Sequence, residues 1–256
     1  MTPELNERFW ELDLIRGVAL LMMGLFHLVY DLEYLDALSL NVQTGFWLYL
    51  AHATATIFLL LVGISLTLSY SRALRVKGLK QNLALKYGKR GLMIFGWGLV
   101  ITFTTWLLLK DGVVVWGILH LIGLSILLAY PLLQLRAVNL VLGLLLLALG
   151  IVLEQVAVGY PWLLWLGLTP EHFHSLDYFP LLPWFGVVLI GVFLGNSLYP
   201  QYTRTFHLGD RSHFPVIRGI SFLGRHSLAI YLLHQPVLIA VLYLLGLVDT
   251  GFLTFS

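Results

Sequence analysis

The residues best suited to chemistry lie near the N-terminus, on what we expect to be one face of a helix. They recur every three or four positions, which is the spacing of a single helical face: Asp13, Arg16, Leu20, Gly24, His27 and Asp31. Ionisable side chains are costly in an apolar span, so we interpret these as functional candidates. His27 is suited to act as a general base, and Asp31 to stabilise the resulting imidazolium. We therefore predict that His27 and Asp31 are catalytic.

Further histidines stand in other apolar segments, at His52, His120 and His234. We interpret them as binding residues for an acceptor substrate, and Tyr231, which shares the expected helical face of His234, as a fourth. A lone histidine in such a segment is also a common hydrogen-bond partner between helices, and that structural interpretation stays open. Trp184 fits either a substrate-binding position or a place at a membrane interface.

Charged residues that can hold phosphate groups flank the same segments. We call the helical face from Asp13 to Asp31 the stripe. The phosphates of a donor substrate could be bound by Arg16 at the beginning of the stripe, and by Arg225 and His226 before the last apolar segment. Asp13 stands three residues before Arg16 and is predicted to share this site, although the two are equally well explained as a structural ion pair.

The composition indicates which elements must position these residues. Hydrophobic residues make up 59% of the 256-residue chain and charged residues only 11%, against about 25% charged in a soluble globular domain. This argues against a soluble enzyme and for a protein whose partner is the lipid bilayer. The absence of cysteine excludes thiolate metal sites and thiol nucleophiles, and a net charge of +2 gives no indication of a nucleic-acid partner.

Long apolar runs predict an all-α integral membrane protein with about seven transmembrane helices in a single domain over residues 1–256. Residues 140–153 are continuously apolar, which is not the alternation of a membrane β-barrel strand. The runs fall at about 17–31, 45–70, 91–109, 113–133, 137–158, 183–199 and 221–248.

The positions of lysine and arginine predict the orientation. With a cytoplasmic N-terminus and alternating helices, every basic residue except Lys110 falls on the cytoplasmic side. We therefore expect the N-terminus inside and the C-terminus outside, in the inner (cytoplasmic) membrane of a bacterium. The basic run at 72–90 is typical of an anchor against anionic lipids, and the loop at about 159–182 of an interfacial or lid segment.

Several strings of the sequence resemble a known family. They are LDLIRGVALLMMGLFHLVYDL, IFLLLVGISLTLS, WGILHLIGLS, DYFPLLPWFGVVLIGVFLG and GRHSLAIYLLHQPVL. They are similar to a prokaryotic membrane family grouped with the catalytic domain of heparan-alpha-glucosaminide N-acetyltransferase, within the transmembrane acyltransferase superfamily. The resemblance implies transfer of an acetyl group from cytoplasmic acetyl-CoA, as co-substrate and without a metal, to a sugar amine or hydroxyl across the membrane.

The resemblance also carries individual residues over by motif. The family opening matches Asp13, Arg16 and Gly17, its outer-loop string matches Asp177, Pro180 and Pro183, and its last helix matches Ser227, Tyr231 and His234. It implies that Asp177 belongs to the acceptor site. The family's essential histidine between the first two helices has no counterpart at residues 32–51, so the role of the base is taken from the stripe and not from the family.

Two alternatives use the same residues differently. The stripe could be the proton path of a polytopic transporter, and four histidines on four helices could ligate b-type haem in an electron-transfer protein. A homodimer is also compatible with the sequence.

Overall fold

The computed structural model describes residues 8–35, 37–77, 82–109 and 112–247. These residues form two compact units, one made of 59–207 and the other of 8–58 with 208–247, and each unit is described by itself. The single domain over residues 1–256 that the sequence predicts stays a prediction. Lys110 lies outside the described residues.

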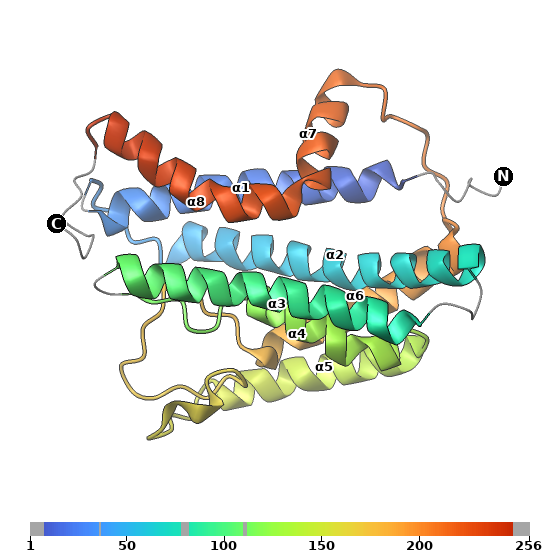
Figure 1. Ribbon diagram of the computed structural model, residues 1–256, viewed down its shortest axis with the longest axis horizontal. Coiled ribbons are helices and arrows are strands. Elements are labelled where there is room, and N and C mark those ends of the chain that lie inside the picture. Colours follow the sequence, from blue (N-terminus) through green and yellow to red (C-terminus); the bar gives the residue numbers. More distant parts are fainter. Residues whose placement is uncertain (1–7, 36, 78–81, 110–111, 248–256) are drawn as a thin grey trace. The chain divides into compact units, whose positions relative to one another are not determined.

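The described residues form helices joined by loops, the longest of them between α5 and α6, and no named strand occurs among these residues (Figure 1). Six helices, α1, α2, α3, α5, α6 and α8, are long and apolar enough to cross a membrane, and a shorter apolar helix covers Ile118–Leu132. The predicted all-α membrane protein is thus confirmed. In chain order the helices are α1 (Trp10–Tyr34), α2 (Gly45–Lys77), α3 (Leu83–Leu108), α4 (Ile118–Ala129), η2 (Tyr130–Leu132), α5 (Arg136–Leu153), η3 (Pro161–Leu163), α6 (Leu181–Leu198), η4 (Pro200–Tyr202), α7 (Pro215–Arg225) and α8 (Ser227–Leu244).

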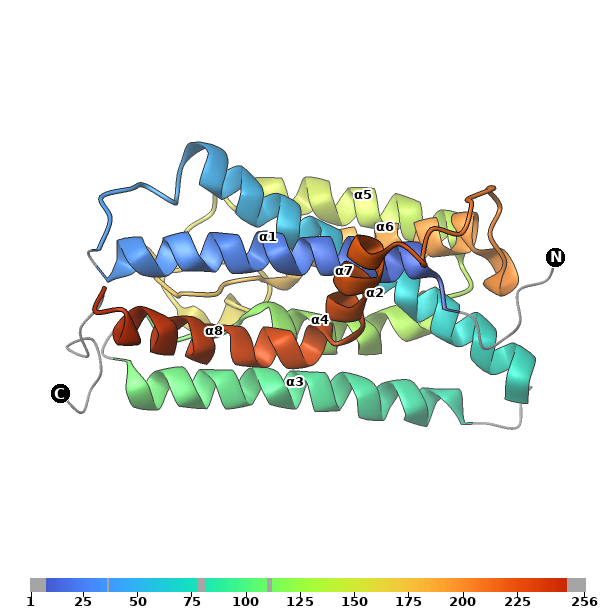
Figure 2. The same cartoon turned by 90° about the horizontal axis from the view of Figure 1, so that it is seen from above.

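The last apolar run is two helices rather than one. Pro215 begins α7, where its fixed φ angle and missing N–H suit the first turn. The chain leaves helical geometry at His226, with φ −104° and ψ 20°, and α8 begins at the next residue. Two perpendicular views show α7 lying across α1 and α8, while α1 and α8 run side by side in the same direction (Figures 1 and 2).

Glycines allow close helix contacts in the unit of residues 59–207. A Cβ atom on Gly143 would lie 2.9 Å from the carbonyl oxygen of Gly186 and one on Gly186 would lie 2.6 Å from that of Gly143, so α5 and α6 pack backbone against backbone. Gly91 of α3 and Gly123 of α4 meet in the same way. Small residues of this kind are the usual contact points of helices in membranes, where no hydrophobic effect drives helices together.

The turn between α4 and α5 is held by side-chain amides. Asn139 is fully buried, and its Nδ2 donates to the carbonyl oxygens of Leu132 and Leu135, both at 2.7 Å. Asn196 donates to the carbonyl oxygen of Leu133 at 2.8 Å. The carbonyl oxygens of Leu132 and Leu135 also accept the backbone N–H groups of Leu135 and Asn139, so the two asparagines add further hydrogen bonds to the carbonyl groups of this turn, which matters most where no water is available.

The long loop after α5 folds back on the segment that precedes α4. Phe179 donates its backbone N–H to the carbonyl oxygen of Trp116 at 2.9 Å, and Ser175 donates its hydroxyl to that of Val113 at 2.9 Å. Tyr178 donates its hydroxyl to the carbonyl oxygen of Leu164 at 2.8 Å, and burial raises the pKa of this phenol to about 12. The loop is therefore an ordered part of its unit that positions the start of α4.

Candidate functional site

The predicted stripe of α1 is a real face of a continuous helix. From Arg16 to His27 the helix rises about 16 Å, at ~1.5 Å per residue, and α1 is helical throughout this stretch. Along the stripe, a Cβ atom added at Gly24 would meet no atom within 4 Å. Open space thus lies beside the stripe at Gly24, whereas Leu20, one turn earlier, is buried.

The far end of the stripe brings together His27 of α1 and His234 of α8. Their ring centroids lie 4.7 Å apart, with the rings nearly perpendicular. The Nδ1 atom of His27 lies 3.0 Å from the carbonyl oxygen of Met23, and that of His234 lies 2.5 Å from the carbonyl oxygen of Tyr231. A carbonyl oxygen only accepts hydrogen bonds, so Nδ1 carries the proton in both contacts and Nε2 of each neutral ring is left as the base.

A second pair from the same two helices lies beside the histidines. Gln235 follows His234 and donates its amide Nε2 to Asp31 Oδ1 at 2.6 Å. Asp31 is buried, with 4% of its surface exposed. Asp31 thus has a hydrogen bond with Gln235, and Met23 provides the contact that orients the imidazole of His27, so the predicted assistance of His27 by Asp31 stays a prediction.

This cluster presents hydrogen-bond acceptors without donors. Asp31 Oδ2, Gln235 Oε1 and His234 Nε2 are buried, and none of them makes a hydrogen bond with any described residue. A buried acceptor left unpaired costs about 1–3 kcal/mol. The arrangement is therefore complementary to a group that brings N–H or O–H donors.

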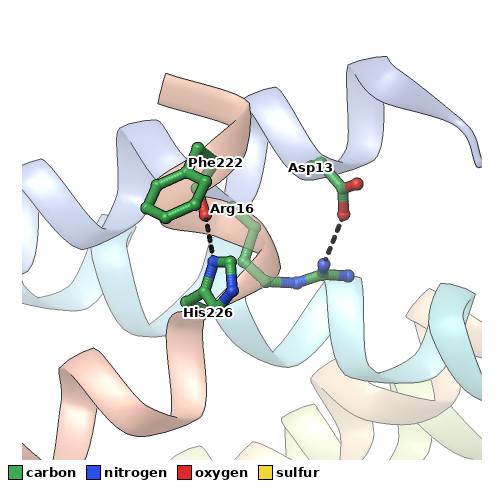
Figure 3. Close-up of polar contacts among 4 residues, drawn as sticks. All are labelled: Asp13, Arg16, Phe222 and His226. Atoms are coloured by element: carbon green, nitrogen blue, oxygen red, sulfur yellow. Dashed lines mark hydrogen bonds and ion pairs between the residues drawn. The ribbon is translucent and has the colours of Figure 1, made fainter. Parts of the chain in front are cut away.

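The other end of the stripe is charged and lies against α7. Arg16 forms an ion pair with Asp13 at 2.9 Å. A Cβ atom on Gly224 would lie only 1.9 Å from the carbonyl oxygen of Asp13, so the end of α7 touches α1 at this level. His226, two residues after Gly224, is drawn in the region of Asp13 and Arg16 (Figure 3), and Arg225 stands between Gly224 and His226 in the sequence. The assignment of this region to a donor remains a prediction.

His226 is held by its own chain. Its Nδ1 lies 2.9 Å from the carbonyl oxygen of Phe222, and its ring lies 4.4 Å from the ring of Phe222 (Figure 3). By the argument used for His27, Nδ1 carries the proton in this contact and Nε2 is the atom left to bind a ligand.

His120 and Asp177, both predicted to bind the acceptor, lie at the start of α4 in the unit of residues 59–207. His120 is 1% exposed, and its Nδ1 accepts the backbone N–H of Gly117 at 3.1 Å. Asp177 accepts the backbone N–H of Ile118 at 3.1 Å. Both side chains therefore satisfy N–H groups of a helix N-terminus, and the ring of Trp116 stacks on His120 at 5.4 Å. This local role is structural, and a role in binding stays a prediction.

The remaining predicted site residues are His52, Trp184 and Tyr231. His52 is exposed on α2, and Trp184 at the start of α6 packs its ring 5.0 Å from that of Phe179. Tyr231 packs its ring 5.4 Å from His234, beside the cluster, and supplies the carbonyl oxygen that fixes that histidine. The predicted roles of His52 and Trp184 in binding an acceptor stay predictions.

Neither a metal site nor a shared haem is evident in these contacts. Within the described ranges, no group of three or more His, Cys, Asp or Glu residues could hold a metal ion. His27 and His234 touch directly, so no porphyrin fits between them as it must for two histidines that ligate one haem iron.

Sequence reasoning missed Gln235 and the backbone carbonyl groups that orient the two histidines. The string HQP in α8 places a second polar residue next to His234. This adjacency to His234 is the signal by which Gln235 could have been counted among the predicted site residues.

One comparison with known proteins gives a family match. The profile of the family described as heparan-alpha-glucosaminide N-acetyltransferase, catalytic, matches residues 8–236. The match includes α1, the loop before α6 and α8 as far as Pro236, and so covers both polar ends of the stripe. No curated protein and no solved structure gives a significant match. Because the match extends over most of its length, the chain belongs to the family of the heparan-alpha-glucosaminide N-acetyltransferase catalytic domain, a family of acetyltransferases.

Proposed function

We propose that the chain transfers an acetyl group from cytoplasmic acetyl-CoA to the amine or hydroxyl group of a sugar on the opposite side of the membrane. The observation that carries the proposal is the α1 stripe, which has Arg16 at one end and the His27–His234 pair at the other. Acetyl-CoA has phosphates at one end of a long arm and a reactive thioester at the other. Its two ends therefore match the two ends of the stripe.

The charged end suits the phosphates of the donor. Arg16 and Arg225 are permanent cations, and His226 can donate from Nε2 when protonated. Asp13 holds Arg16 at 2.9 Å and so limits its rotamers. The open space at Gly24 supports a path for the pantetheine arm between the two ends.

The histidine end suits proton transfer. Nε2 of His27 takes a proton from the acceptor amine or hydroxyl as its nitrogen or oxygen forms a bond to the acetyl carbonyl carbon. The carbon–sulfur bond breaks, and the sulfur leaves with its electron pair and takes up a proton to become the thiol of CoA. The unpaired acceptor atoms of Asp31, His234 and Gln235 can bind N–H and O–H groups of a sugar.

The sidedness follows from two features. Under the topology predicted from the sequence, most basic residues fall on the same side of the membrane as Arg16, and the positive-inside rule assigns that side to the cytoplasm. Since α1 and α8 run in the same direction, both lead from that side to the histidine pair (Figure 2). The proposal thus puts acetyl-CoA on the cytoplasmic side of a bacterial inner membrane, and the acceptor outside.

The test uses sealed proteoliposomes with labelled acetyl-CoA on the side of Arg16 and amino sugars or other glycans on the opposite side. Wild type should release CoA and label the acceptor. His27→Ala should lower transfer by about 10²–10⁴-fold, the usual contribution of a general base, without loss of acetyl-CoA binding. His207→Ala, an exposed histidine far from the stripe in sequence, is the matched control and should transfer like wild type.

Two outcomes would overturn the proposal. Transfer by His27→Ala at the wild-type rate would remove His27 from catalysis. A wild type that neither binds nor turns over acetyl-CoA, but exchanges a labelled solute across the membrane, would favour the transporter alternative.

A further inference from the structure

The helix α7 has two different faces. Ser221 and Gly224 are buried, and Gly224 approaches the backbone of α1. On the opposite face Val216 is 72% exposed and Phe222 is 54% exposed. The polar and apolar residues of α7 are separated more strongly than in any other described helix. Neither Val216 nor Phe222 has a part in the proposed transfer.

The exposed face contains a hollow of about 440 Å³. Its lining combines cationic and apolar side chains and includes no carboxylate: His213, Pro215, Arg218, Gly219, Phe222 and Arg225. Arg218 and Arg225 are seven residues, or two helical turns, apart and so lie on the same side of α7. Two guanidinium groups at this spacing form a site for a phosphate group.

The direction of α7 indicates where such a phosphate group comes from. α7 lies across α1 and α8, which are long and apolar enough to cross the membrane (Figures 1 and 2). A helix that crosses membrane-spanning helices in this way lies along the plane of the bilayer. Exposed Phe and Val side chains next to arginines are typical of helices that rest in the lipid interface.

We propose that the hollow on α7 binds the headgroup of an anionic phospholipid, with the acyl chains beside Phe222 and Val216. The charge of the lining fits a phosphodiester, and the neighbouring apolar side chains fit the lipid chains. The hollow faces away from the side of α7 that packs on α1, and Arg225 is the one lining residue that is also assigned to the proposed donor site. The phosphates of acetyl-CoA are the other source of the same chemistry.

The experiment compares Arg218→Gln with Arg211→Gln, which removes an exposed arginine seven residues earlier that does not line the hollow. The full chain is reconstituted in vesicles of phosphatidylglycerol and phosphatidylcholine in equal parts and extracted in mild detergent. The phosphatidylglycerol that remains bound to each chain is counted by native mass spectrometry. Acetyl-CoA affinity is measured on the same samples by calorimetry.

Arg218→Gln should weaken phosphatidylglycerol retention by about fivefold, the equivalent of ~1 kcal/mol for one cationic side chain at the lipid surface. Arg211→Gln should retain the lipid like wild type, and both variants should bind acetyl-CoA like wild type. Equal retention by Arg218→Gln and Arg211→Gln would overturn the proposal. Weaker acetyl-CoA binding in Arg218→Gln with unchanged lipid retention would assign the hollow to the phosphates of CoA and would also overturn it.

Discussion

The contact between α1 and α7 makes Gly17→Ala a sharp test of the site's geometry. A Cβ atom at Gly17 would lie 2.0 Å from the carbonyl oxygen of Ile220 and 2.7 Å from its Cγ2. The first of these atoms belongs to the backbone, so a rotamer change cannot relieve the clash. α7 must move away from α1 by more than an ångström before the contact becomes ordinary.

Gly24 of the same helix is the matched control, because a Cβ atom there meets nothing within 4 Å. Replacing glycine by alanine inside a helix stabilises the fold by about 0.5–1 kcal/mol. Both variants receive this gain, but only Gly17→Ala also receives the cost of overpacking, about 1–3 kcal/mol. The two variants should therefore differ in free energy of unfolding by about 1–3 kcal/mol, with Gly17→Ala the less stable.

The assay is thermal unfolding of the purified chain in one detergent, followed by tryptophan fluorescence. One kcal/mol corresponds to about 2–4 °C for a chain of this length, so the Tm of Gly17→Ala should lie several degrees below that of Gly24→Ala. Acetyl-CoA binding should weaken in Gly17→Ala, since Arg16 and Arg225 stand next to the displaced contact. A Tm of Gly17→Ala equal to or above that of Gly24→Ala would refute the packing of α7 on α1.

Three further predictions concern other parts of the chain. Asn139→Leu should lower the free energy of unfolding by about 0.5–1.5 kcal/mol for each of the two side-chain hydrogen bonds lost, because the carbonyl oxygens of Leu132 and Leu135 keep a backbone N–H partner; a thermal unfolding curve like that of wild type would contradict the role of this amide. The folded-state pKa of Tyr178, about 12, lies above the unfolded value of ~10, so its contribution to stability is present below pH ~10 and is lost as pH rises from there towards 12. Ultraviolet titration of wild type against Tyr178→Phe checks this, and a difference midpoint near 10 would contradict it. Because the chain has no cysteine, Glu171→Cys and Ser212→Cys can be labelled singly with an impermeant thiol reagent; we expect labelling from opposite sides of a sealed vesicle, and labelling of both from one side would contradict the proposed topology.

Much of the fold can be predicted from the sequence because the residues within each helix carry the pattern that indicates it. The apolar runs and the helical spacing from Asp13 to Asp31 depend only on residues of one segment. The break at His226 was not predicted, because the surrounding run is apolar on both sides. Just before this break Gly224 packs against the backbone of α1, a contact that the local sequence pattern does not specify.

The same distinction explains the site. Periodicity places His27 and Asp31 on one face of α1, but the helix that faces them depends on how helices are arranged in space. That arrangement gives Gln235 its contact with Asp31, at a separation of 204 residues along the chain. His120 likewise accepts the backbone N–H of Gly117, a contact that the apolar pattern of its segment does not specify, and its predicted role in binding an acceptor stays a prediction.

The loss of folding stability caused by unpaired hydrogen-bond acceptors beside His27 supports a function for these groups. The three unpaired acceptor atoms of Asp31, His234 and Gln235 lower stability unless a ligand supplies donors. Packing alone would be served better by apolar residues of similar size, as it is along most of α8. Proteins depart from such local rules mainly at functional sites. The polar residues at this end of the stripe therefore support the proposal that the substrate bound there carries several N–H or O–H groups. A sugar that receives an acetyl group is a ligand of this kind.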